Sequence, residues 1–282
     1  MKNTYLFLAA ALLLSTTACD TTRQTQENEA QMATDVTGER SGPTPSGAVM
    51  SKDGLRVYAF NDSPTFPESQ LRLNSPATGS VVEPGAVEFS YDLSNYQLTR
   101  MTSHTNSEHL ANSEQGQHIH NIVDNEPYTA HYETQFTKDI EEGDHVVLSF
   151  LSRSYHESLK HKGAYDLRMI TVGRPAQRME FDTNAPHMFY SRPKGEYTGA
   201  DTERIMLDFY LVNTDLSTTG NKVRATINGS TVFTLDRWLP YIIEGLPMGE
   251  NTIKLELIDN AGTVLPGPFN TVTRTFTLTS NS

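Results

Sequence analysis

Histidines gather in one part of this chain, and the spacing of two of them suits a metal ion. The chain has nine histidines, and eight lie between residues 104 and 161. One residue separates His118 from His120, so on a strand both imidazoles project from the same side, about 6.6 Å apart. Two imidazoles at that spacing can reach one divalent transition-metal ion. Further ligands could come from the same face or from nearby segments: Asp124, His131 and His156.

The histidine pair also has plainer interpretations. A His-x-His sequence on the outer face of a strand is often polar surface, and neutral histidines form hydrogen bonds in crowded sheets. A small-molecule or glycan site is a third interpretation, and the pattern alone leaves all three open.

A polar segment, SRSYHESLKHKG at 152–163, is the second candidate site. Its mixture of Arg, Tyr, His, Glu and Lys can bind an anion, a peptide or a sugar. The candidate ligand-binding residues are Tyr155, His156, Glu157 and Lys160. The same segment also fits a solvated loop opened by a Ser-x-x-Glu turn, so both interpretations stay open.

The N-terminus resembles a bacterial lipoprotein signal. Lys2 precedes a short apolar run over 5–14, and the only cysteine, Cys19, follows it. About ten apolar residues are too few to cross a bilayer, which needs about twenty, so the run is typical of a cleaved export signal. Cys19 would then carry the lipid, although Thr16 stands where this type of signal usually has Leu. We expect a bacterial cell-envelope location, lipid-anchored to a membrane and facing the periplasm or the outside.

Composition limits the partners. The formal net charge is −12, which opposes binding to nucleic acid. With one cysteine the chain forms no internal disulfide, so its domains depend on packing. The expected partners are the membrane, through the anchor, and an envelope protein, peptide or glycan.

The folded part contains an internal repeat. Gly116 matches Gly220 and Gly143 matches Gly249, at offsets of 104 and 106 residues, which are typical of a domain duplication. Both copies show the two-residue apolar alternation of half-buried strands, separated by turn residues. The pattern predicts an all-β protein with two tandem immunoglobulin-like β-sandwich domains.

These observations divide the chain into six segments. Residues 20–49 lack Ile, Leu, Phe, Tyr and Trp, which indicates a flexible tether. The connection between the copies is polar and contains proline, so we expect it to make few contacts of its own. The predicted segments are a lipoprotein signal (1–18), a tether (19–50), an N-terminal strand and connection (51–68), the His-rich first sandwich (69–173), a linker (174–185) and the second sandwich (186–280).

The aligned copies also predict which way side chains point. His118 and His120 match Lys222 and Arg224, so both should project from the outer face of their strand. Leu148 and Phe150 match Lys254 and Glu256 and should also point outward, where two large apolar groups need a cover. We expect that cover to come from within the chain; a partner is the alternative.

Several blocks resemble a family of exported Bacteroidetes lipoproteins. The blocks are GQHIHNIVDNEPYTAHYE, FLSRSYHESLKHKGAY, FYSRPKGEYTG and GLPMGENTIKLELID. The resemblance covers nearly everything from Leu55 to the C-terminus. It implies an envelope location and two domains, but it assigns no activity and no catalytic residues.

No signature of a catalytic site is present in the sequence. The chain lacks a Gly-x-Ser-x-Gly elbow, a Gly-rich phosphate loop and a His-Glu-x-x-His zinc helix. We therefore predict a non-enzymatic binding or scaffolding module, with no cofactor assigned beyond a possible divalent transition metal. The alternative is a metal-binding protein or metal-dependent hydrolase with a His site on the first domain.

Overall fold

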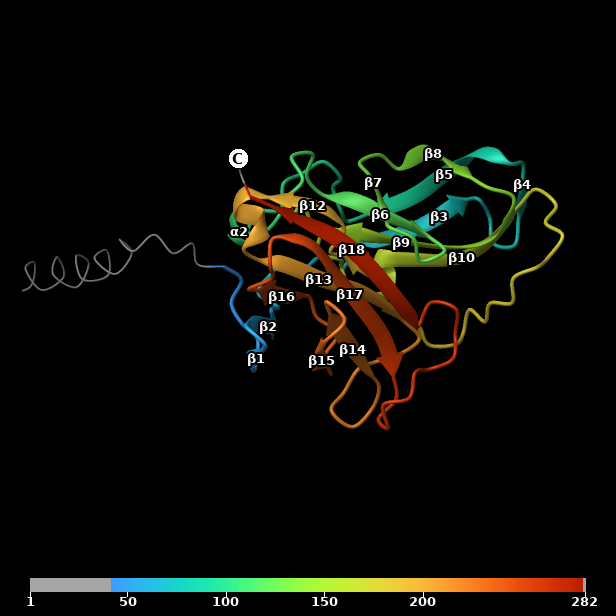
Figure 1. Ribbon diagram of the computed structural model, residues 1–282. Coiled ribbons are helices and arrows are strands. Elements are labelled where there is room, and N and C mark those ends of the chain that lie inside the picture. The colour runs from blue at the N-terminus through green and yellow to red at the C-terminus, as the bar shows by residue number, and fades with distance from the viewer. Residues whose placement is uncertain (1–41, 281–282) are drawn as a thin grey trace, which may run out of the picture. The chain divides into compact units, whose positions relative to one another are not determined.

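The computed structural model describes residues 42–280, and strands dominate this part of the chain (Figure 1). Within that range the only α-helix is the four-residue α2 (Asn106–His109). No helix between residues 42 and 280 combines the length and apolar character needed to cross a bilayer. The predicted signal, Cys19 and the tether up to residue 41 lie outside the described residues.

The first sandwich pairs a three-stranded sheet with a five-stranded sheet. The three-stranded sheet has the order β3 (Gln70–Ser75), β5 (Gly85–Ser94), β8 (Gln135–Ile140). The five-stranded sheet has the order β4 (Val81–Val82), β10 (Tyr165–Val172), β9 (Gly143–Ser152), β6 (His118–Val123), β7 (Thr129–His131). Their facing apolar side chains, including Phe89 and Ile119, form one core.

The second sandwich pairs two five-stranded sheets. One has the order β1 (Met50–Lys52), β2 (Leu55–Ala59), β16 (Tyr241–Glu244), β13 (Ile205–Val212), β11 (His187–Arg192). The other has the order β12 (Gly195–Thr198), β18 (Thr271–Thr279), β17 (Gly249–Ile258), β14 (Lys222–Ile227), β15 (Thr231–Leu235).

Sheet topology confirms the two tandem sandwiches. The order β4-β10-β9-β6-β7 recurs as β12-β18-β17-β14-β15, and β3-β5-β8 recurs as β11-β13-β16. The register is also the same: His120 pairs with Phe150 in the first copy, as Arg224 pairs with Glu256 in the second. The predicted outward direction of these side chains is therefore confirmed, because alternation along a strand leaves Ile119 and Val223 in the two cores.

The N-terminal strand belongs to the second sandwich. β2 pairs with β16, so the first strands between residues 42 and 280 extend a sheet formed nearly 200 residues later. The end of the expected tether also differs from the prediction, since Thr44 donates to Asp62 and Ser46 to Ala59. Small polar residues at 42–49 can lie along an existing strand without a core of their own, and composition does not distinguish that state from a free tether.

The outer face of the first sandwich is covered by the second. Phe150 stacks on Tyr210 with ring centroids 4.7 Å apart, and Leu148 joins the same buried cluster as Phe189. This confirms the expected intramolecular cover and identifies it as the sheet that contains β11 and β13. The linker makes more contacts than expected, because Arg178 pairs with Asp144 at 2.6 Å.

Candidate functional site

His118 and His120 lie at the contact between the two sandwiches. Both project from the outer face of β6, and neither has any exposed surface. The second sandwich covers this face, so a pair expected on an outer face is buried between two domains. The residue that follows on the same face, Ile122, packs in the apolar cluster between the sandwiches.

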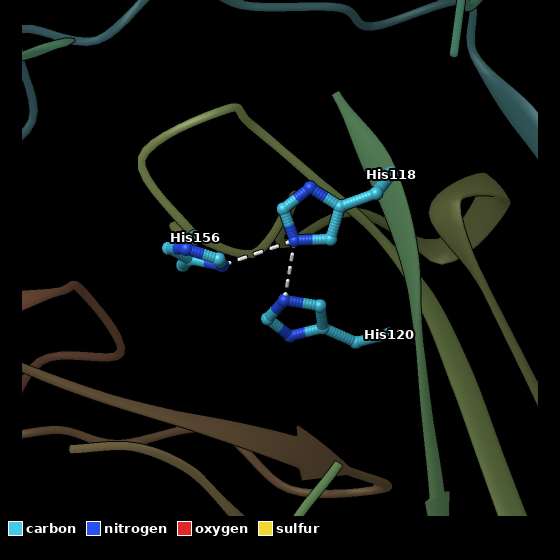
Figure 2. A group of neighbouring side chains, drawn as sticks. All are labelled: His118, His120 and His156. Carbon is cyan, nitrogen blue, oxygen red and sulfur yellow. Dashed lines mark hydrogen bonds between the residues drawn. The ribbon is translucent and has the colours of Figure 1, made fainter. Parts of the chain in front are cut away.

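A third imidazole converges on this pair (Figure 2). Nε2 of His118 lies 2.8 Å from Nε2 of His120 and 3.1 Å from Nδ1 of His156. All three candidate ligand atoms lie within 4.8 Å of one another. His156, predicted as a possible further ligand, is thus brought to the pair from a different segment.

The loop after β9 presents His156 in a left-handed conformation. His156 has φ of 65° and donates its backbone N–H to Arg153 O at 2.9 Å, which closes a tight turn. An ion pair between Arg153 and Glu157, 2.9 Å long and buried, holds the ends of the turn together. A non-glycine residue in this region of φ is uncommon and depends on support from its surroundings.

Backbone contacts orient the first imidazole. Nδ1 of His118 lies 2.7 Å from the carbonyl oxygen of Gly116 and donates to it, which leaves Nε2 with a lone pair directed at the other two rings. A carbonyl acceptor on the distal nitrogen is the usual support of a metal-binding histidine. Nδ1 of His120 is buried without a hydrogen-bond partner among the described residues.

Burial keeps all three imidazoles neutral. It lowers the pKa of His118 to about 4, and the positive charges of Arg192 and Lys194 act in the same direction. Burial also holds the pKa values of His120 and His156 well below the usual range for histidine. Neutral imidazole is the form that binds metal, so no proton has to leave these rings first.

The spacing is close to that of ligands around one ion. Nitrogen atoms bound tetrahedrally to zinc at 2.0–2.1 Å lie about 3.3 Å apart. The two separations from Nε2 of His118, 2.8 and 3.1 Å, are slightly smaller, and the group as a whole spans up to 4.8 Å, so the rings of His120 and His156 would shift toward each other around an ion. Three imidazoles of this set fit zinc, copper, nickel or iron.

Two of the predicted metal ligands do not reach the cluster. Asp124 accepts from Nδ1 of His145 at 2.6 Å and from the backbone of Val146, so its carboxylate closes the turn after β6. His131 pairs in register with Ile119, and its ring stacks on Phe136 at 3.3 Å. Asp124 lies beyond the end of β6 with a positive φ, so strand alternation no longer sets its direction.

The predicted ligand-binding residues of the 152–163 loop make internal contacts. Tyr155 is fully buried in a cluster with Phe60 and Ile242. Lys160 forms an ion pair with Asp208, which is fully buried on β13. The loop therefore joins the sandwiches, and of its four candidates only His156 meets the other histidines.

Three further residues lie beside the cluster, and no pattern in the sequence predicted them. Tyr128 stacks on His120 with centroids 3.5 Å apart and an interplanar angle of 11°. Arg192 and Lys194, from the second sandwich, contact the same tyrosine. No local pattern marks these residues, because only the packing of one domain on the other brings them to the histidines.

Comparison with known proteins adds weak similarities only. No family model matches the chain, and no curated protein matches it. The fibronectin(III)-like modules of CbhA from Clostridium thermocellum share 10% identity at a TM-score of 0.27, covering 75% of this chain and 95% of theirs. SGBP-B of the mixed-linkage glucan utilization locus of Bacteroides ovatus, solved with a mixed-linkage heptasaccharide, shares 9% at 0.23, covering 75% and 71%.

The central fibronectin-III array of RIM-binding protein is similar to the same degree. It shares 11% identity at a TM-score of 0.26, covering 76% of this chain and 69% of the array.

Proposed function

We propose that this protein is a non-enzymatic lipoprotein of the bacterial envelope that binds a transition-metal ion between its two sandwich domains. The convergence of the three imidazoles of His118, His120 and His156 carries the proposal. Neutral imidazole nitrogens are ligands that suit zinc and copper.

Burial favours binding over catalysis at this site. Catalytic zinc keeps an open position that a substrate can reach. His118 and His120 have no exposed surface, and the sheet containing β13 covers them. We therefore propose a structural metal that fixes the loop of His156 against strand β6, rather than one that activates water for a substrate.

Metal binding is tested by calorimetry on the full chain purified in detergent. We expect Zn²⁺ or Cu²⁺ to bind at one ion per chain, and the double variant His118→Ala/His120→Ala to lose that binding. The matched control is Lys222→Ala/Arg224→Ala, which alters the equivalent positions of the second copy and should bind as the wild type does. Equal binding by all three proteins, or by none, would refute the metal site.

Lipid anchoring at Cys19 is a separate part of the proposal. It is supported by the lone cysteine after a short apolar run. We expect Cys19→Ala to move the protein from the membrane fraction to the soluble fraction, while a neighbouring change, Thr21→Ala, leaves it membrane-bound. Unchanged membrane retention of the Cys19 variant would remove the anchor from the proposal.

A cleft on the first sandwich favours a second candidate function, binding of a glycan or peptide. The cleft has a volume of about 610 Å³, and its lining includes the aromatic rings of Phe66 and Tyr96 and the charged side chain of Arg100. Aromatic faces combined with polar groups suit a sugar ring or an extended chain. A glycan array probed with wild type and Arg100→Ala tests this: binding that the variant reduces supports it, and no binding opposes it.

A further inference from the structure

A lysine of the first sandwich and an aspartate of the second meet in a buried contact. Nζ of Lys160, on the loop between β9 and β10, contacts Oδ1 of Asp208 on β13. The side chain of Asp208 has no exposed surface, and that of Lys160 is 11% exposed. The cost of removing two charges from water can exceed their mutual attraction. An uncharged arrangement of the same two side chains would avoid that cost.

The surrounding groups hold this lysine and this aspartate in one position. Nζ of Lys160 also donates to Oγ of Ser158 and lies 6.0 Å from the centroid of the Trp238 ring. The backbone N–H of Ser158 donates to the other oxygen of Asp208, Oδ2, at 3.3 Å. A nitrogen in contact with a carboxylate oxygen lies about 3–3.5 Å from the carboxyl carbon, which is the separation of reacting atoms held for attack.

We propose that Nζ of Lys160 and Cγ of Asp208 become joined by an amide bond, which cross-links the two sandwiches covalently. The bond between Nζ and Cγ forms, and the bond between Cγ and Oδ1 breaks. That oxygen leaves as water, together with two of the three ammonium protons. No oxidant or reductant takes part, so the two side chains supply every atom of the step. The product is uncharged, which removes the buried charges.

The surroundings of the pair favour each part of this step. Transfer of one proton from the ammonium group to the carboxylate makes both groups neutral, and a site shielded from water favours neutral groups. The amine then has a lone pair with which to attack Cγ. The N–H of Ser158 stabilises the negative charge that develops on Oδ2. A cleft of about 260 Å³, lined by Lys160 and Trp238, gives the released water a route to solvent.

A lysine–glutamate pair on β17 shows what distinguishes this contact. Lys254 and Glu256 lie 2.8 Å apart, but the side chain of Lys254 is 42% exposed. Its ammonium group stays hydrated, so we expect no cross-link there. The chain has one cysteine and forms no internal disulfide. An amide between the sandwiches would supply the kind of covalent link that extracellular proteins commonly obtain from disulfides.

Mass spectrometry of the full chain purified in detergent tests the cross-link. After denaturation and trypsin digestion, we expect one branched species that joins the peptides containing Lys160 and Asp208. Its mass should be about 18 Da below the sum of the two peptides, because one water has left. Trypsin should not cleave after Lys160, since an amide nitrogen carries no charge. Fragmentation of the branched species locates the bond, and wild type alone suffices for this measurement.

Lys160→Arg is the most informative variant. The guanidinium group keeps a positive charge beside Asp208 but does not act as the nucleophile, so the branched peptide should disappear. The midpoint of urea unfolding should also fall, because the cross-link no longer restricts the unfolded chain. The matched control is Lys254→Arg, which should keep both the branched peptide and the midpoint of wild type.

Two results would overturn the inference. Cleavage after Lys160 in wild type, with the peptide of Asp208 recovered free, would leave an ordinary ion pair. A branched peptide that persists in Lys160→Arg would assign the bond to another lysine. Neither result bears on the proposed metal site, because the measurement involves no metal.

Discussion

Strands β6 and β14 occupy the same place in their two sandwiches, yet their outer faces have opposite chemistry. β6 carries His118 and His120, which are fully buried, whereas β14 carries Lys222 and Arg224, which are partly exposed. The two strands have equivalent neighbours: β6 lies between β9 and β7, and β14 lies between β17 and β15. The difference therefore arises from what covers each face.

The neighbouring strands show the same contrast. Phe150, on β9, packs on aromatic rings of the second sandwich, while its counterpart Glu256, on β17, forms ion pairs with Arg224 and Lys254, both at 2.8 Å. Hydrogen bonding to Arg224 lowers the pKa of Glu256 to about 2, whereas burial lowers that of His118 to about 4. One scaffold thus keeps carboxylates charged on one copy and imidazoles neutral on the other.

The largest expected effect comes from removing the apolar cover. Phe150→Ala leaves a cavity beside Tyr210 and His120, so the free energy of unfolding should fall by about 3–5 kcal/mol. The equivalent change in the second copy, Glu256→Ala, opens no aromatic cavity and leaves Arg224 and Lys254 partly solvated, so it should cost less, at most about 2 kcal/mol. Urea unfolding of both variants makes the measurement, and equal losses would contradict the comparison.

Acidification should destabilise the two faces in different pH ranges. His118 has a pKa of about 4 when folded and 6.5 as its ordinary value, so below pH 6.5 the unfolded chain binds a proton that the folded chain does not. The contribution of His118 to the free energy of unfolding is complete above pH 6.5. About 3 kcal/mol of it is lost as the pH falls from 6.5 to 4. We expect unfolding of the metal-free protein to show this slope.

Glu256 gives the control for that window. Its pKa is depressed from 4.5 to about 2, so its contribution is present above pH 4.5 and is lost only as the pH falls toward 2. His118→Asn/His120→Asn should reduce the slope between pH 6.5 and 4.5, with a remainder from His156, whose pKa is also lowered, whereas Glu256→Gln should leave the slope unchanged. An equal slope in wild type and the histidine variant would assign it to other groups.

Bound metal should raise the free energy of unfolding by an amount similar to the acid effect of His118. At a free Zn²⁺ concentration of 100 times the dissociation constant, the linkage relation gives about 2.7 kcal/mol. The stabilisation should disappear with a chelator and should be absent from His118→Ala/His120→Ala. Thermal unfolding with and without Zn²⁺ measures it, and an equal shift in the double variant would indicate binding elsewhere.

The smallest expected effect comes from placing a histidine pair at the equivalent positions of β14. Lys222→His/Arg224→His reproduces the pair of β6 on β14, but β14 has neither a covering domain nor a counterpart of His156 beside it. We expect the metal content to stay at one ion per chain by elemental analysis. Two ions per chain would show that the pair alone forms the site, without burial or the third imidazole.

Local patterns in the sequence predicted much of the fold of this protein. Alternation along the strands and the offset between Gly116 and Gly220 predicted the duplicated sandwiches, because the two-residue period of a strand is a property of the backbone itself. The same period predicted that His118 and His120 point away from their own core. These predictions depend only on neighbours within one strand and on comparison of the two copies.

The tertiary structure alone decided what those side chains meet. The position of β2 beside β16, the cover over Phe150 and the approach of His156 and Tyr128 to the histidine pair all join segments far apart in the chain. Such contacts are selected by shape and burial across whole faces, so no spacing in the sequence encodes them. A histidine pair becomes a candidate metal centre only when a second domain buries it and a loop supplies the third imidazole.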